Sequence, residues 1–201
     1  MSEAKSVLEI LRYPDPRLRR KALPVEAVTP ELVKLAQDML ETMYASKGIG
    51  LAAPQVAHSI RLLVTDTRPR ENGRYTIEDL TDLEKAVEQP FVIFNPVIIK
   101  KEGKTSFDEG CLSVPGYFET VDRFDYIEVE GLNLKGEKFV TKVDGLLAIC
   151  IQHEIDHLDG KLFIDRLSTI KSNRIKSKIK KLGYPDPNQK EEAEAEEEVE
   201  L

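Results

Sequence analysis

The residues best suited to chemistry lie in the run His153-Glu-Ile-Asp-His157. On an α-helix, positions four residues apart lie one turn apart and about 40° from each other in azimuth. Two imidazoles at these positions can therefore bind one metal ion, and Glu154 beside them can act as a general base toward a water on that ion. The alternative is a helix whose two histidines are only hydrogen-bonded, because the five-residue pattern also occurs in unrelated helices.

A third ligand distinguishes the enzyme families that use such a helix. A metzincin has a further histidine six residues after the second one, but that position is Phe163. A thermolysin-like enzyme uses a downstream glutamate, and here the downstream glutamates begin only at Glu191, in an acidic tail. The remaining candidates are His58, Cys111 and Cys150.

Of these three, Cys111 is the favoured ligand. Gly110 before it lets the backbone run close to another group, and a Cys-His-His set leaves one position open, as catalytic metal sites do. The alternative for a lone cysteine is a buried and inert side chain. Cys150, in an apolar run one turn before His153, is interpreted as a pocket wall, and His58 as a surface residue. A different metallopeptidase and a closed structural metal site both remain open.

These side chains need elements that position them. The order Thr29-Pro-Glu31 predicts a helix start, an apolar stripe follows, and Gly48 is expected to end that helix. Apolar and alternating runs predict strands over residues 60–65, 91–99, 126–134 and 138–143. A second helix, with Asp144 as its cap, is expected to reach about Leu158 and to carry the two histidines. Few strands are separated by helices, so the fold class is α+β.

Three further segments complete the organisation of the chain. Residues 67–90 are polar and turn-rich, then weakly helical, and are expected to form a surface insertion. Residues 170–182 predict a basic amphipathic helix, with an apolar stripe through Ile170, Ile175, Ile179 and Leu182. The last dozen residues hold seven glutamates and one lysine, so they are expected to be a disordered tail.

The composition bounds the protein class. The chain has 201 residues and a net charge of −7, nearly all of it from the acidic tail. This length fits one domain with an appendage. Two cysteines cannot form a disulfide framework, which indicates a reducing compartment. No apolar run is long enough for a transmembrane helix or a signal peptide, and neither a membrane nor DNA is an expected partner.

Three segments, in this order, resemble the motifs of the peptide deformylase family: Gly48-Ile-Gly-Leu-Ala-Ala-Pro-Gln55, Glu109-Gly-Cys-Leu-Ser113 and Gln152-His-Glu-Ile-Asp-His157. Their combination is far more specific than any one of them. The resemblance implies antiparallel sheets packed around a central HExxH helix, with a C-terminal helix. Together with the composition of the C-terminal segments, it predicts a catalytic domain at residues 1–168, a basic helix at 169–184 and an acidic tail at 185–201.

The resemblance also implies an activity. The protein would be a cytoplasmic hydrolase that removes the formyl group from formylmethionine at the start of nascent polypeptides and releases formate. Cys111, His153 and His157 would bind one divalent metal, usually Fe²⁺, with Zn²⁺, Ni²⁺ or Co²⁺ as substitutes. Glu154 would move the proton, while the Gln55 amide and the Leu112 backbone N–H would bind the developing oxyanion. The positions expected to shape the methionine pocket are Ile49, Gly50, Glu109, Gly110, Ile149 and Cys150.

Two features depart from the family pattern or extend it. Many members carry a basic residue shortly after the cysteine turn, whereas here no arginine occurs between Cys111 and Arg123. The basic residues 171–181 correspond to a helix that docks on the ribosome in some members, and six cations facing a polyphosphate surface fit that role. The alternative is a solvated helix face, which the acidic tail could mask.

Overall fold

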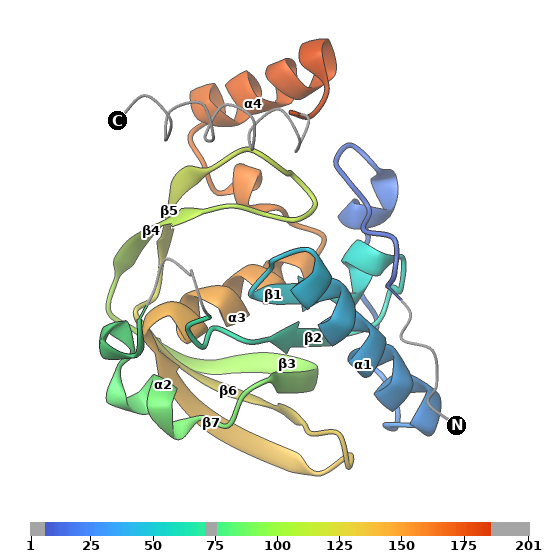
Figure 1. Ribbon diagram of the computed structural model, residues 1–201, viewed down its shortest axis with the longest axis vertical. Helices are drawn as coiled ribbons and strands as arrows, with labels where there is room; N and C mark the ends of the chain where they lie inside the picture. The colour runs from blue at the N-terminus through green and yellow to red at the C-terminus, as the bar shows by residue number, and fades with distance from the viewer. Residues whose placement is uncertain (1–6, 71–75, 186–201) are drawn as a thin grey trace, which may run out of the picture.

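The computed structural model describes residues 7–70 and 76–185 of the chain. Its main element is an antiparallel five-stranded sheet in the order β1-β2-β3-β6-β7, and β4 and β5 form a separate two-stranded ribbon. The described strands are β1 (Gly50–Ala52), β2 (Leu62–Thr65), β3 (Phe91–Glu102), β4 (Thr105–Glu109), β5 (Glu119–Arg123), β6 (Tyr126–Leu132) and β7 (Lys138–Asp144). The described α-helices are α1 (Pro30–Ala45), α2 (Asp82–Ala86), α3 (Gly145–Leu158) and α4 (Thr169–Leu182), and short 3-10 helices lie between some of the other elements. The expected α+β class is confirmed (Figure 1).

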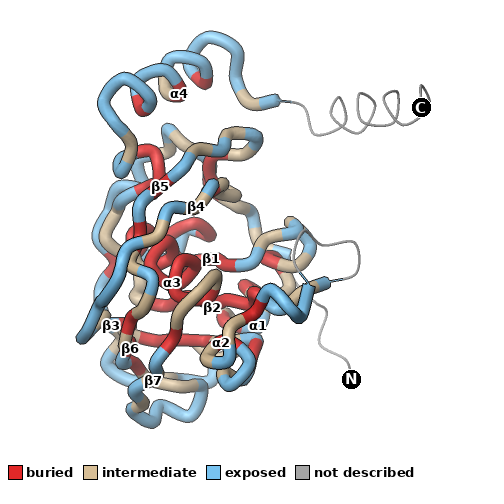
Figure 2. The backbone as a smooth tube through the Cα atoms, turned by 90° about the vertical axis from the view of Figure 1, so that its left-hand side faces the viewer, coloured by how far each residue is buried: buried red, intermediate tan, exposed pale blue. Residues whose placement is uncertain are grey.

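Helices α1 and α3 cover opposite faces of the sheet where β2 and β3 run. Successive strand side chains point to opposite faces. Leu62 and Val64 of β2 accordingly pack in a cluster with α1, while Leu63 between them packs in a cluster with α3. Burial on both faces explains why β2 is an unbroken apolar run. It also places the HExxH helix α3 in the interior, where Figure 2 shows a largely buried backbone.

The expected helix and strand positions are confirmed, with corrections at some ends. Thr29 caps α1 and Pro30 begins it, but the helix ends at Ala45, because Lys47 already has a positive φ. The strands predicted at residues 60–65, 91–99, 126–134 and 138–143 correspond to β2, β3, β6 and β7. The short strands β1, β4 and β5 were not predicted.

Residues 76–90 are mostly exposed, as expected of a surface insertion, but Glu84 is an exception that the sequence did not indicate. Glu84 of α2 is 2% exposed, and its carboxylate accepts hydrogen bonds from the backbone N–H of Leu147 at 2.8 Å and of Thr81 at 3.0 Å. Leu147 lies in the first turn of α3, where N–H groups lack helical partners. Asp144 precedes α3 as expected but makes no capping hydrogen bond, so Glu84 takes over the capping role.

Helix α4 packs on a third apolar cluster, together with Val121 of β5 and with Phe163. Of the expected stripe, Ile175 and Ile179 are buried there, whereas Ile170 and Leu182 are exposed, which corrects the stripe at both ends. The predicted acidic tail lies, from residue 186 on, outside the described residues. None of the described helices has the length and apolar character that crossing a bilayer requires.

Candidate metal centre and substrate pocket

Three soft or borderline ligand atoms converge between α3 and the loop after β4. The Sγ atom of Cys111 lies 3.3 Å from Nε2 of His157, which lies 3.2 Å from Nε2 of His153. The three candidate ligand atoms all lie within 4.8 Å of one another. The structure thus brings together the three residues that the sequence predicted as ligands, from positions 46 residues apart in the chain.

The geometry of these three residues fits a divalent metal. Two nitrogens bound at about 2.0–2.1 Å to a tetrahedral ion are about 3.3 Å apart, close to the separation of the two histidine Nε2 atoms. Burial lowers the pKa of His157 well below its usual value, so that ring is neutral and offers a lone pair. A thiolate with two imidazoles suits both Zn²⁺ and Fe²⁺.

A buried chain of charges fixes the orientation of His153. Its Nδ1 atom lies 2.7 Å from Oε2 of Glu109. Arg123 donates one hydrogen bond to each carboxylate oxygen of Glu109, at 2.6 Å to Oε1 and at 2.8 Å to Oε2. Arg123 also donates to Asp156 at 2.6 Å. Burial alone would raise the pKa of Glu109, but the hydrogen bonds from Arg123 and His153 lower it to about 2. The ionised Glu109 therefore accepts the proton on Nδ1, so Nε2 is the ring nitrogen of His153 that faces the other candidate ligands.

Glu154 lies beside this centre with an open hydrogen-bonding capacity. Its carboxylate is buried, and Oε2 has no hydrogen-bond partner among the described residues. Burial raises the pKa of Glu154 to about 7, which is the range where a general base works best near neutral pH. Gly50 makes room for this carboxylate, because a Cβ at that position would lie 2.9 Å from Cδ of Glu154.

Two candidate donors belong to the same region, the Gln55 side-chain amide and the Leu112 backbone N–H. Oε1 of Gln55 accepts from the backbone N–H of Ala52 at 2.8 Å, which fixes the amide so that Nε2 points toward Ser113 and Cys111. Nε2 lies 3.1 Å from Oγ of Ser113 and 3.7 Å from Sγ of Cys111. The backbone N–H of Leu112 makes no hydrogen bond to any other described residue. The Gln55 amide therefore lies near the metal ligands, and the Leu112 N–H directly follows Cys111 in the chain.

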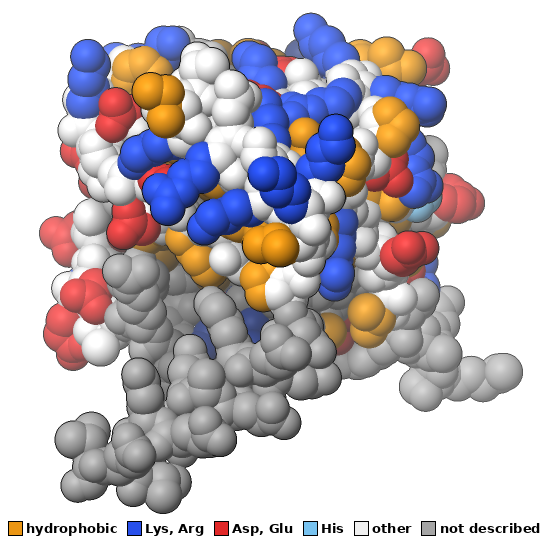
Figure 3. All heavy atoms as spheres, turned by 90° about the horizontal axis from the view of Figure 1, so that it is seen from above, with side chains coloured by type: hydrophobic (Ala, Val, Ile, Leu, Met, Phe, Trp, Pro, Cys, Tyr) orange, Lys and Arg blue, Asp and Glu red, His pale blue; other side chains and the backbone are white. Residues whose placement is uncertain are grey.

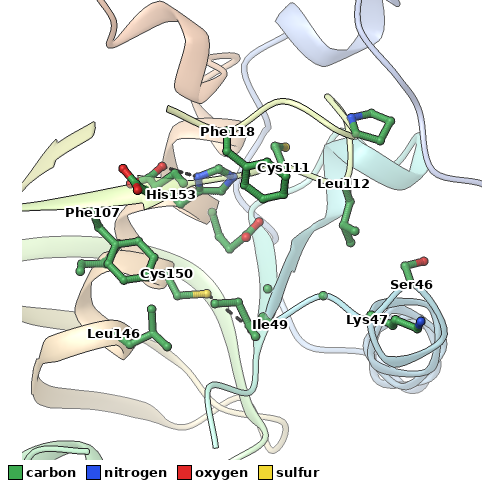
Figure 4. A pocket seen from close by; sticks show the side chains of 18 of the residues that line it. Ser46, Lys47, Ile49, Phe107, Cys111, Leu112, Phe118, Leu146, Cys150 and His153 are labelled. Carbon is green, nitrogen blue, oxygen red and sulfur yellow. Dashed lines mark hydrogen bonds and ion pairs between the residues drawn. The ribbon is translucent and has the colours of Figure 1, made fainter. Parts of the chain in front are cut away.

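A cavity of about 500 Å³ opens next to these groups. All six expected pocket residues line it: Ile49, Gly50, Glu109, Gly110, Ile149 and Cys150. Figure 4 shows Cys150 with Phe107 and Leu146 at one end of the cavity, and Cys111 with His153 and Phe118 at the other. Burial raises the pKa of the Cys150 thiol well above its usual value, so this side chain remains protonated and forms an apolar wall. His58 is exposed, as expected, and is not among the residues that line this cavity.

Comparison with known proteins agrees with this geometry. A family model described as polypeptide deformylase matches residues 7–173. A peptide deformylase of Neisseria meningitidis serogroup C is 50% identical over 176 residues, which is 88% of this chain and 96% of the relative. The chain belongs to the peptide deformylase family.

Two solved structures of deformylases are similar in fold. One is the Ehrlichia chaffeensis peptide deformylase in complex with actinonin, with a TM-score of 0.76 and 41% identity over 88% of this chain and 99% of that one. The other is the Met-Ala-Ser-bound class I type b peptide deformylase of Acinetobacter baumannii, with a TM-score of 0.72 and 32% identity over 82% of this chain and all of that one.

Several residues of this deformylase site were not predicted from the sequence. Arg123 and Ser113 hold the side chains of Glu109 and Gln55 in place, and Phe107, Leu146 and Phe118 line the pocket. A buried Arg beside a buried Glu is a signal of pairing, but the two lie 14 residues apart on different strands. The pairing of β4 with β5 puts Glu109 opposite Glu119 and Arg123 opposite Thr105, so the two residues meet only through their side chains, which the sequence did not indicate.

Proposed function

We infer that this chain is a peptide deformylase, a hydrolase that removes the N-formyl group from the N-terminus of nascent peptides. The observation that supports the chemistry best is the position of Glu154. Its Oε2, which has no hydrogen-bond partner in the part of the chain that the structure describes, lies next to a converging Cys-His-His set, at the wall of a largely apolar cavity. In a family member, that arrangement suits hydrolysis of an amide whose neighbouring side chain is apolar.

We propose that Cys111, His153 and His157 hold one divalent metal, Fe²⁺ in the cell, with Zn²⁺, Ni²⁺ or Co²⁺ as substitutes. When bound, such an ion polarises a carbonyl and makes a water nucleophilic at neutral pH. Arg123 and Glu109 keep the His153 ring in the tautomer that can bind it. The open thiolate side of the site makes Cys111 sensitive to oxidation, so the protein is best handled without oxygen.

The proton is moved by Glu154 in this proposal. Oε2 takes a proton from the attacking water and returns it to the amine as the formyl carbon separates from nitrogen. Nε2 of Gln55 and the N–H of Leu112 donate to the oxygen that becomes negative during the attack. The apolar wall formed by Ile149 and Cys150 would receive the methionine side chain, and formate and a free amino terminus would leave.

The experiment that tests this function measures formate release from formyl-Met-Ala-Ser by anaerobically purified protein. We expect activity from the wild type and a loss of about 10²–10⁴-fold in Glu154→Gln, with metal content unchanged by elemental analysis. Glu130→Gln, an exposed carboxylate on β6, is the matched control and should retain full activity. Formate from neither protein, despite a full metal complement, would favour a structural metal site or another metalloamidase.

We also propose formylated nascent polypeptides and the ribosome as partners, which places the enzyme in the cytoplasm. Helix α4 carries six cations: Lys171, Arg174, Lys176, Lys178, Lys180 and Lys181. Lys171 and Lys176 pair with Glu119 and Asp165, whereas the other four make no ion pair within the part of the chain that the structure describes. Lys and Arg side chains gather on this side of the molecule (Figure 3).

Cosedimentation with ribosomes at increasing salt tests the docking. We expect the wild type to sediment with ribosomes and to be released as salt rises. Lys and Arg side chains displace salt cations from the phosphates when they bind, so a higher salt concentration favours the unbound state. Reversal of Arg174, Lys178 and Lys180 to Glu should abolish sedimentation while peptide deformylation continues. Reversal of two exposed lysines of β7, Lys138 and Lys142, is the matched control. Equal binding by both variants would refute docking through α4.

A further inference from the structure

The residues that follow α4 turn back toward the metal centre. Gly183 ends the helix, and its backbone N–H donates to the carbonyl of Ile179. The next residue, Tyr184, is half-buried and packs against the third apolar cluster, as Tyr13 and Cys111 also do. The end of the basic helix and one candidate metal ligand therefore share the same packing cluster, although neither belongs to the other's element.

The hydroxyl of Tyr184 joins two separate backbone segments. It donates a hydrogen bond to the carbonyl oxygen of Tyr13 at 2.5 Å and lies 3.5 Å from the carbonyl oxygen of Ser113. The backbone N–H of Tyr13 donates to the same Ser113 carbonyl at 2.9 Å. In Figure 1 the red end of α4 accordingly lies near the blue N-terminal loop that carries Tyr13. One side chain thus connects the end of α4, the N-terminal loop and the turn that follows Cys111.

Further contacts keep Tyr184 in this place. The guanidinium carbon of Arg12 lies 5.8 Å from the centroid of its ring, and the Tyr117 ring meets it edge-on with centroids 6.3 Å apart. A Cβ at Gly116 would lie only 2.7 Å from Cγ of Pro185, so Pro185 packs directly on the backbone after the cysteine turn. Residues 184 and 185 are therefore held both by the N-terminal loop and by the segment that carries the candidate ligand.

The turn that Tyr184 contacts positions two groups of the site. The backbone N–H of Ser113 donates to Sγ of Cys111 at 3.4 Å, and Oγ of Ser113 accepts from Nε2 of Gln55 at 3.1 Å. Of the three candidate metal ligands, Cys111 alone lies outside α3. Its distance from the two histidines therefore depends on how firmly this turn is held against the rest of the protein.

We propose that Tyr184 is a positioning residue of the metal centre, which holds the turn after Cys111 in place and so slows the release of the bound metal. Groups that orient a metal ligand without touching the metal contribute to metal affinity. Tyr184 contacts neither the substrate cavity nor Glu154, so the rate at full metal occupancy should depend little on it. The proposal rests on the metal site of the proposed function.

The test measures metal release from protein loaded with Co²⁺. A bond between a thiolate and Co²⁺ gives a charge-transfer absorption, and its decay after addition of excess chelator reports how fast Cys111 loses the ion. We expect Tyr184→Phe, which keeps the ring and loses the hydroxyl, to release Co²⁺ about fivefold faster than the wild type, the factor for one lost hydrogen bond. Tyr184→Ala, which also loses the ring, should release it at least about tenfold faster. Formate release by both variants at saturating metal should stay close to that of the wild type.

Tyr126→Phe is the matched control, because it removes a hydroxyl that donates to Glu128 within β6 and should leave the release rate unchanged. Release from both Tyr184 variants at the wild-type rate would overturn the proposal. Equal acceleration in Tyr126→Phe would also overturn it, since release would then follow general stability. A wild type that shows no charge-transfer absorption with Co²⁺ would instead overturn the metal site of the proposed function.

Discussion

Helices α3 and α4 have the same length of 14 residues but opposite surroundings. Eleven residues of α3 are buried, among them both histidines, Glu154, Gln152 and Asp156, whereas only three residues of α4 are buried. A buried polar group is costly unless it has a partner, while an exposed one is solvated by water. The two helices are equally long, but α3 holds individually fixed polar groups whereas α4 forms a charged surface.

The difference lies in how each polar side chain is partnered. Gln152 of α3 accepts from the backbone N–H of Phe124 and donates to its carbonyl, and Asp156 is paired with Arg123 and Arg166. Each of these groups has a specific partner, so the loss of any one of them should measurably change stability or activity. The cations of α4 act through their summed field, so single losses should be small. The following predictions test this contrast, beginning with the largest expected effect.

Arg123 and Arg174 provide the most direct test, because both are arginines and only the first is buried. Arg123→Met leaves Glu109 and Asp156 with fewer partners inside the protein, and loss of one partner of a buried pair costs about 3–5 kcal/mol. Arg174→Met should change the free energy of unfolding by no more than about 0.5 kcal/mol. Urea denaturation of both variants checks this. Similar values for the two arginines would contradict the contrast.

Metal removal should destabilise the region of α3 and leave α4 nearly unaffected. A ligand at 100 times its dissociation constant stabilises the folded state by about 2.7 kcal/mol, and the candidate site links the loop at Cys111 to α3. Treatment with a chelator should therefore lower the melting temperature of the wild type. It should not lower that of Cys111→Ala, which has already lost a ligand. Hydrogen exchange should accelerate in α3 and not in α4, and uniform acceleration would count against a local effect.

Substitutions of Gly50 and Gly183 test how crowded the backbone is beside Glu154 of α3 and after the end of α4. A Cβ at Gly50 would lie 2.7 Å from Sγ of Cys150 and would displace Glu154, whereas a Cβ at Gly183 meets nothing within 4 Å. Gly50→Ala should lower kcat by about 100-fold, because small displacements of a catalytic group have large effects on rate. Gly183→Ala, at φ +75° and ψ −157°, strains the backbone and should cost about 1–3 kcal/mol of stability but no activity. Formate release and thermal unfolding of both variants check this.

The same contrast explains what could be predicted from the sequence. The two histidines and Glu154 are fixed by local helical spacing, and Cys111 by its glycine-flanked turn, so this set was predictable. Glu84 could not be recognised as the cap of α3, because it lies 63 residues from Leu147 and its role depends on tertiary packing. Arg123 could not be recognised as the partner of Glu109, because β4 and β5 are short and carry few apolar residues.

The extent of the apolar stripe of α4 was also not predictable, since periodicity does not show where the supporting core ends. This leads to the smallest predicted effect. Ile179 is 7% exposed and packs on the cluster with Phe163, whereas Leu182 is 79% exposed. Ile179→Ala should cost about 2 kcal/mol, the lower limit for removing a buried isoleucine side chain, because the site lies at the surface of the core. Leu182→Ala should cost less than about 0.5 kcal/mol. Chemical denaturation measures both values.

Limited proteolysis then locates the effect, because a loosened α4 should be cleaved while deformylation of a tripeptide continues. Loss of tripeptide activity in Ile179→Ala would mean that α4 and the site around α3 unfold as one unit. The two helices would then differ in burial but not in how their unfolding is coupled.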